Sequence, residues 1–236
     1  MFDRLVRVLD RLAAPEMPPV ALIGGLAVNL RLSTAADAHR VTQDVDVVVE
    51  DTAPHAIEIL AEDAEAVGTD TVVTEGVTIQ VIETHPISAA ELGELTDGDR
   101  LFVLAHRWAL ETATTVTVST TGDAPQASIP VAVAAGLVAT KSHAAGYPRQ
   151  ARRATKHGGD LYDVFRLVEV FDTRGELRDQ IKSAPADLGG LVSDVVDAEI
   201  LSDPGRAVRQ MQSASSTVLD AQRVVDVMEP FVASLR

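Results

Sequence analysis

The hydrophobic pattern of this 236-residue chain changes its period near residue 130. Before this point, apolar residues at helical spacing alternate with short runs rich in β-branched residues. After it, apolar residues recur almost only at three- and four-residue steps. We therefore expect an α/β (α+β) fold with two parts: a mixed-sheet α/β domain over 1–130 and a helical domain over 131–236.

Glycine and proline divide both parts into short elements. Strands are expected at 20–23, 45–49, 71–74, 77–82, 115–118 and 128–131, with a hairpin turn at Glu75-Gly76. Helices are expected in the first part at 5–12, 26–32, 54–67 and 101–112. In the second part they are expected at 133–145, 160–171, 191–201, 205–211 and 218–235.

The composition supports a folded core and limits the classes of function. Apolar residues make up 46% of the chain, and the absence of cysteine excludes disulfides, thiolate metal sites and a cysteine nucleophile. No apolar run reaches the ~18 residues that span a bilayer, and no signal-peptide pattern is present, so we expect a cytoplasmic protein without membrane contact. The net charge of −15 restricts any RNA contact to a local basic patch.

Two glycines and two acids form the pattern with the most chemical content. Gly24-Gly25 ends a short apolar strand and opens a helix, where backbone N–H groups and the helix dipole favour a phosphate. Asp44 and Asp46 follow about twenty residues later, two apart in a valine-rich strand, so their side chains share one face. Two carboxylates on such a strand need compensation, which paired Mg²⁺ ions that also bind substrate phosphates would provide.

Each half of this pattern alone has an ordinary structural explanation. A Gly-Gly pair by itself marks a turn, and an Asp-x-Asp pair by itself is a solvated strand edge. In this order and spacing, with Arg40 and Thr42 just before the acids, we favour the phosphate-binding interpretation. His143 and Phe102, taken singly, are interpreted as structural residues.

The densest positive cluster of this acidic chain lies in its helical part and consists of Lys141, Arg149, Arg152, Arg153, Lys156 and His157. A solvated helix face and a local RNA-binding patch explain the three arginines equally well. Lys141 differs because it follows the apolar run 133–140 and would reach inward from a buried helix. A desolvated lysine needs an anionic partner, and a triphosphate would serve.

These motifs together resemble the AbiEii-type nucleotidyltransferases, which belong to the polymerase-β-like superfamily and include the MenT toxins of toxin–antitoxin systems. The matching motifs are, in chain order, Gly24-Gly25, Arg40-x-Thr42-x-Asp44-x-Asp46, Lys141 and Asp160-Leu161-Tyr162-Asp163. They span about residues 20–170, and no single motif is decisive. The resemblance implies a nucleotidyltransferase-like domain followed by the helical C-terminal domain of that family.

The resemblance also implies a role for each matching residue. Asp44 and Asp46 would hold one or two Mg²⁺ ions, and Gly24 and Gly25 would cradle the phosphates of a nucleoside triphosphate (NTP). Binding of the nucleotide would further involve Arg40, Thr42 and Lys141. Asp160 would complete the catalytic site, whereas Asp163 could equally hold the helix start or an arginine.

Two departures from the family pattern bear on activity. The superfamily often carries a third carboxylate on a later strand, and here Gln80 occupies the natural position, with Glu83 expected on the opposite face. Lys156 lies four residues before Asp160, whereas the family often has a basic residue directly before that acid. Either Asp160 substitutes for the missing acid, or the chain binds nucleotide with weakened catalysis.

The expected activity is Mg²⁺-dependent transfer of a nucleoside monophosphate from an NTP to an RNA acceptor. Family analogy suggests the 3′ end of a transfer RNA, contacted by the basic cluster, and a cognate antitoxin protein as partner. Transfer to a small molecule or to a protein hydroxyl is the second interpretation. A catalytically silent nucleotide-binding protein is the third, and Gln80 is the residue that favours it.

Overall fold

The computed structural model describes residues 2–33, 44–51, 55–119, 126–147, 154–215 and 217–236. Its strands are β1 (Val20–Ile23), β2 (Asp44–Glu50), β3 (Ala66–Val67), β4 (Thr71–Thr74), β5 (Val77–Thr84), β6 (Thr114–Ser119) and β7 (Gln126–Val131). Its helices are α1 (Phe2–Leu12), α2 (Gly24–Leu32), α3 (Ala56–Ala61), α4 (Ala89–Gly93), α5 (Asp97–Glu111), α6 (Ala134–Gly146), α7 (Ala154–Phe171), α8 (Glu176–Lys182), α9 (Leu188–Val196), α10 (Pro204–Ala214) and α11 (Ala221–Leu235). A π-helical turn over Asp197–Leu201 continues α9.

The strands of the described chain form one mixed sheet in the order β3-β4-β5-β2-β1-β7-β6. The central strand β2 is antiparallel to β1 and parallel to β5, and β7 is parallel to β1. Four valines make β2 apolar, and all of them are buried, as expected for a strand covered on both faces. The predicted α/β class with a mixed sheet is confirmed.

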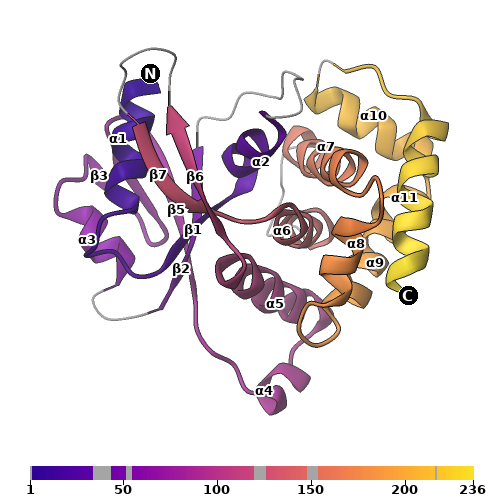
Figure 1. The fold of residues 1–236 in the computed structure, drawn as a ribbon, viewed down its shortest axis with the longest axis horizontal. Helices are drawn as coiled ribbons and strands as arrows, with labels where there is room; N and C mark the ends of the chain where they lie inside the picture. Colours follow the sequence, from indigo (N-terminus) through magenta and orange to yellow (C-terminus); the bar gives the residue numbers. More distant parts are fainter. Residues whose placement is uncertain (1, 34–43, 52–54, 120–125, 148–153, 216) are drawn as a thin grey trace.

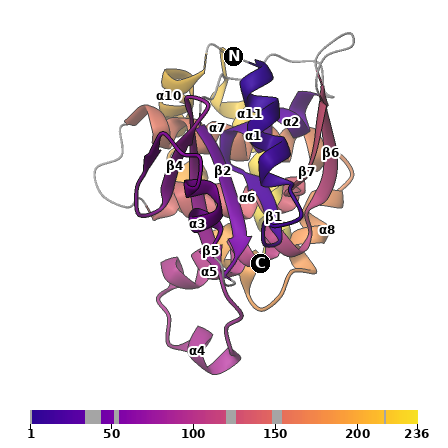
Figure 2. The same ribbon diagram turned by 90° about the vertical axis from the view of Figure 1, so that its left-hand side faces the viewer.

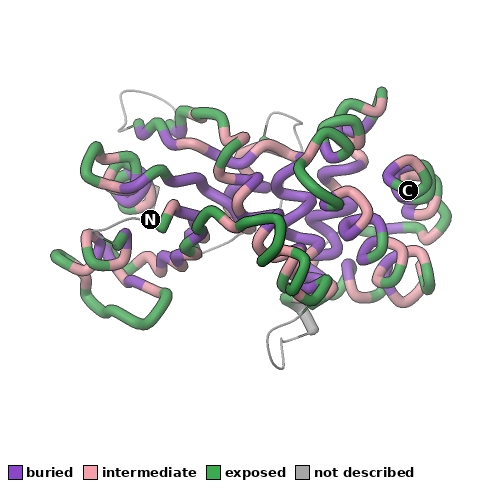
Figure 3. The backbone as a smooth tube through the Cα atoms, turned by 90° about the horizontal axis from the view of Figure 1, so that it is seen from below, coloured by how far each residue is buried: buried purple, intermediate pink, exposed green. Residues whose placement is uncertain are grey.

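Helices cover both faces of this sheet. Figure 1 shows α1 and α3 on one face and α2 and α5 on the other, and Figure 2 looks onto the α1–α3 face. Helix α6 contacts α2, α5 and α7, and the later helices lie farther from the sheet. Buried backbone runs through the middle of the molecule, where the sheet meets the central helices (Figure 3).

The domain boundary near residue 130 stays a prediction. β7 ends at Val131, and the described residues after it contain helices and no strand. Among the helices that the structure describes, none has both the length and the apolar character needed to cross a bilayer.

The predicted hairpin at Glu75-Gly76 is confirmed. Thr74 pairs with Val77, and both turn residues have positive φ angles, 55° at Glu75 and 69° at Gly76. Positive φ at both central residues is the requirement of the type I′ turn, which matches the twist of the two strands that it joins.

The expectation of a single helix over 54–67 is wrong. α3 ends at Ala61, and Ala66–Val67 form the edge strand β3, antiparallel to β4. Backbone N–H groups of Glu65 and Gly68 donate to carbonyls of the β4 segment at 2.8 and 2.7 Å. Pairing with β4 therefore outweighs the local helical preference of this segment.

The expected start of a helix at residue 160 is also wrong, because α7 begins at Ala154 and runs through Gly158. A Cβ atom at Gly158 would lie 2.1 Å from the carbonyl oxygen of Gln210 in α10. Glycine thus permits close contact of two helices here, although its low helix propensity had suggested a break. The short helices α4 and α8 were not expected from the sequence.

Candidate active site

The predicted glycine corner lies directly against one of the predicted acids. β1 runs into α2 at Gly24, which has a φ of +68°. Ile23, the residue before it, pairs with Asp46 across the β1–β2 ladder. A Cβ atom at Gly24 would lie 1.9 Å from Oδ2 of Asp46. Only glycine fits this position, for reasons of both backbone conformation and space.

We expect the variant Gly24→Ala to lower the free energy of unfolding by more than about 1–2 kcal/mol, the cost of a left-handed conformation for an L-residue. The clash with Asp46 adds to this cost and displaces the carboxylate. Gly190→Ala in α9 is the matched control, because a Cβ there meets no atom within 4 Å. Urea denaturation measures both, and equal stabilities of the two variants would contradict the close approach of Gly24 to Asp46.

The two predicted acids occupy different environments. Asp44 begins β2 and is exposed, whereas Asp46 is partly buried and lines a cleft. In the parallel ladder with β5, Asp44 pairs with Thr78 and Asp46 pairs with Gln80. Gln80 therefore lies beside Asp46 on the sheet, and its amide donates to Asp70 Oδ2 at 3.4 Å.

The pKa of the Asp46 carboxyl group is shifted by burial and by several neighbouring charges. Burial raises the pKa of its carboxyl group above the usual range, although the positive charges of Lys141 and Lys156 act in the opposite direction. The negative charges of Asp44 and Asp160 raise the pKa further. Within the described ranges, no hydrogen-bond donor or ion-pair partner contacts its oxygens. A desolvated carboxylate in this position favours a bound cation.

Lys141 is held by two buried acids of the neighbouring helix. Its Nζ lies 2.8 Å from Asp160 Oδ1 and 2.8 Å from Asp163 Oδ2, and these contacts join α6 to α7. The three residues are 6%, 2% and 0% exposed, respectively. The sequence had predicted a buried lysine with an anionic partner, and in the structure two carboxylates of the chain itself fill that role. Asp163 contacts Lys141 from within α7.

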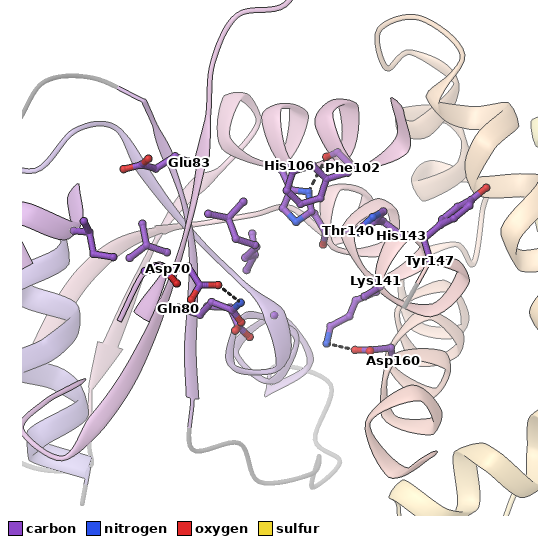
Figure 4. Close-up of a pocket in the computed structure, with 18 of the residues that line it drawn as sticks. Asp70, Gln80, Glu83, Phe102, His106, Thr140, Lys141, His143, Tyr147 and Asp160 are labelled. Atoms are coloured by element: carbon purple, nitrogen blue, oxygen red, sulfur yellow. Dashed lines mark hydrogen bonds and ion pairs between the residues drawn. The ribbon is translucent and has the colours of Figure 1, made fainter. Parts of the chain in front are cut away.

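A cleft of about 550 Å³ lies between the sheet and the central helices. This volume falls in the range of small-molecule sites, ~300–1,000 Å³. Of the predicted residues, those that line it are Gly24, Asp46, Gln80, Lys141, Lys156 and Asp160. Figure 4 shows Gln80 on the sheet side and Lys141 with Asp160 on the helical side. The cleft thus brings together groups that are more than one hundred residues apart in the sequence.

The other predicted residues lie elsewhere or outside the described part. Gly25 is buried in the first turn of α2, and Asp44 and Asp163 are not among the residues that line the cleft. Lys156 is exposed on α7 at the edge of the cleft. Outside the described residues lie Arg40, Thr42, Arg149, Arg152 and Arg153.

A cluster of four rings on the helical wall was missed by the sequence interpretation. Phe102 and His106 of α5 are 4.4 Å apart between ring centroids, and His143 of α6 lies 5.1 Å from Phe102 and 6.0 Å from Tyr147. All four residues line the cleft, so Phe102 and His143 are cleft residues rather than purely structural ones. His106 Nδ1 lies 2.7 Å from the Phe102 carbonyl oxygen, the spacing of a hydrogen bond. Phe102 and His106 are four residues apart in the sequence, as are His143 and Tyr147, and this spacing was the available signal.

The cleft between the mixed sheet and the central helices is lined by both carboxylates and lysines. A family model described as nucleotidyl transferase AbiEii toxin, type IV toxin–antitoxin (TA) system, matches residues 7–215. The chain therefore belongs to the AbiEii nucleotidyltransferase toxin family, as the sequence motifs had indicated, and it is a nucleotidyltransferase. A comparison with curated proteins found no match. Membership in this family implies a nucleotide substrate and an antitoxin partner.

Proposed function

We propose that this chain is a Mg²⁺-dependent toxin that transfers a nucleoside monophosphate from an NTP to the 3′ end of a transfer RNA. The observation that carries the proposal is the Asp46 carboxylate, which is desolvated, lies against Gly24 and opens into the cleft that Lys141 also lines. Membership in a nucleotidyltransferase toxin family supports the reaction class. The acceptor and the metal are the parts that require experiment.

The acid pair on β2 suits Mg²⁺. Magnesium prefers carboxylate oxygens, keeps several waters and shares its remaining positions with substrate phosphates. Asp46 would supply a ligand from the cleft, and Asp44, which is exposed two residues away on the same strand, would supply a second from outside the cleft lining. When bound, the ion would lower the pKa of the attacking hydroxyl and stabilise the charge that develops on the transferred phosphate.

The chain's own residues would bind and orient the nucleotide. The first-turn N–H groups of α2, at Gly24 and Gly25, would hold phosphate oxygens, because the side chain before them provides no cap for this helix. Lys141 would place a positive charge opposite the leaving phosphates, and Asp160 and Asp163 would fix the position of that charge. Lys141 would therefore act from a preorganised position.

The ring cluster supports a nucleotide as the ligand. Aromatic and imidazole rings at the cleft wall offer faces on which a base can stack, at about 1–3 kcal/mol for each base contact. Phe102 and His143 lie on the same helical wall as Lys141, and Figure 4 shows all three facing one space. We assign this wall to the base and the Gly24 corner to the phosphates.

The acceptor is proposed to be RNA because the local charge at the cleft edge differs from that of the whole chain. Lys156 is exposed there, and the sequence places Arg149, Arg152 and Arg153 just before it. Such a patch would hold an RNA end in a cytoplasmic protein of net charge −15. The pairing of Gln80 rather than an acid with Asp46 favours weakened catalysis compared with a site that has a third carboxylate.

Incubation of the protein with each labelled NTP and total transfer RNA tests the proposal. We expect one labelled acceptor whose labelling requires Mg²⁺ and is lost in Asp44→Ala and Asp46→Ala, because the metal then lacks a ligand. Labelling by these variants equal to that of the wild type would reject the mechanism. Tight binding of nucleotide by the wild type without labelling of any acceptor would also reject it. Charge reversal of Arg152 and Arg153 separates the acceptors, since salt-sensitive RNA binding should then disappear, whereas transfer to a small molecule should not change.

A further inference from the structure

Three side chains with metal-binding atoms converge at the carboxyl ends of β2 and β5, away from the glycine corner. Asp51 directly follows β2, Glu83 lies near the end of β5, and His55 immediately precedes α3. The parallel ladder pairs Val49 with Glu83, and the N–H of Asp51 donates to the Thr84 carbonyl at 2.7 Å. The sheet itself therefore brings the two acids to one edge, and the residue that opens α3 adds the imidazole.

The separations of these atoms are close to those of a tetrahedral metal site. His55 Nδ1 lies 3.2 Å from Asp51 Oδ1 and 3.4 Å from Glu83 Oε1, and the three ligand atoms lie within 4.8 Å of one another. Ligands bound tetrahedrally at about 2.0–2.2 Å from Zn²⁺ are about 3.3–3.6 Å apart. Any further shortening of the distances between the ligand atoms would come from rotation of the Asp51 and Glu83 side chains, which are 38% and 37% exposed.

The charges at this point favour a divalent cation. Among the described residues, only the His55 imidazole lies within ion-pair distance of a carboxylate oxygen of Asp51 or Glu83. The carboxylate of Glu58 adds a further negative charge nearby. It accepts a hydrogen bond from the His55 backbone N–H at 3.3 Å. Several carboxylates around one imidazole repel one another unless a cation lies between them.

We propose that Asp51, His55 and Glu83 bind a divalent transition-metal ion of the Zn²⁺ type, with water as the fourth ligand on the exposed side. An imidazole nitrogen with two carboxylates suits Zn²⁺, whereas Mg²⁺ prefers oxygen ligands alone. Asp51 lies five residues beyond Asp46, about 16 Å along an extended strand, so this site is separate from the acid pair. Figure 4 shows Glu83 well apart from Lys141 and Asp160.

Such an ion would connect the ends of two central strands to the start of α3. His55 and Glu83 also line the cleft, so the ion would fix the shape of the cleft at the end remote from Lys141. The inference does not depend on the proposed transfer reaction, because it uses none of the residues assigned to that reaction.

Titration of the metal-free full-length protein with ZnCl₂, in a large excess of Mg²⁺, tests the proposal by calorimetry. We expect one equivalent of Zn²⁺ to bind, and the affinity to fall more than about tenfold in His55→Gln and in Glu83→Gln. Substitution with Co²⁺ should give the intense visible absorption of a tetrahedral site, and His55→Gln should lose it. Unchanged circular dichroism establishes that the variants remain folded.

Two control variants make the result specific. His157→Gln removes another imidazole that lies near a carboxylate, with Nε2 3.5 Å from Glu199 Oε2, and should leave Zn²⁺ binding unchanged. Asp46→Asn should also bind Zn²⁺ like the wild type. Wild-type affinity in His55→Gln, or loss of binding in Asp46→Asn but not in His55→Gln, would overturn the proposal. Because the readout is metal binding, such a failure leaves the proposed transfer reaction unaffected.

Discussion

Replacing Asp46 with asparagine is expected to lower the rate of nucleotide transfer by at least about 10³-fold, since it removes the proposed metal ligand at the point where charge would develop. The amide has nearly the same shape, so the variant should fit beside Gly24 and stay folded. Transfer of a labelled nucleotide, measured as kcat/KM against Mg²⁺ concentration, gives the result. Asp10→Asn, an exposed acid on α1, is the matched control and should behave like the wild type.

The Asp46→Asn variant should lose activity but should not lose folding stability. Because burial raises the pKa of Asp46, the folded state binds this proton more tightly than the unfolded chain does. The ionised carboxylate therefore costs folding stability at neutral pH, and the cost disappears as the pH falls through the raised pKa toward the ordinary value. We expect metal-free Asp46→Asn to be at least as stable as the wild type at pH 7 and to lack this pH dependence. Clear destabilisation at pH 7 would contradict the assigned electrostatics.

Replacing Lys141 with methionine is expected to lower the free energy of unfolding by about 3–5 kcal/mol, the usual cost of removing one partner of a buried ion pair. Methionine fills much of the volume of the lysine stem, but Asp160 and Asp163 then remain buried without their common cation. Chemical denaturation monitored by circular dichroism measures the loss. Lys182→Met, an exposed lysine at the end of α8, serves as the control and should change little.

A double variant separates stability from activity. Lys141→Met with Asp163→Asn removes one of the two carboxylates that Lys141 contacts and should recover part of the lost stability, because the effects of substitutions at contacting residues are not additive. Nucleotide transfer should stay low in the double variant, since the positive charge at the cleft is still missing. A Lys141→Met protein as stable as the wild type would show that the ion pairs of Lys141 do not stabilise the packing of α6 against α7.

The strands that form the site could be predicted well from the sequence. β1 matches its expected bounds, and β2 and β5 extend theirs by one or two residues at an end, because runs of β-branched residues bounded by glycine or acids mark buried strands clearly. The side that each acid faces follows from the period of two. Asp46 beside Gln80, with Glu83 three residues farther along β5, is therefore the arrangement that the sequence had indicated.

Other features could not be predicted because they depend on contacts between distant segments. β3 exists through its pairing with β4, and α7 passes through Gly158 because α10 lies against it. The partners of Lys141 were open at the sequence level, since a buried cation can be neutralised by a ligand or by the chain. The ring cluster combines α5 with α6, and a single sequence does not show which helix faces meet.

Asp46 lies in β2, the central strand of the seven-stranded sheet that the structure describes, and this location limits how the strand can move. A shift of β2 by one residue would break the ladders with both β1 and β5 and would turn its acids to the opposite face of the sheet. Asp46, the proposed metal ligand, is therefore held in a strand that is paired on both of its edges. We therefore expect any widening or closing of the cleft around substrates of different size to involve α6 and α7, which carry Lys141 and its two acids, rather than β2.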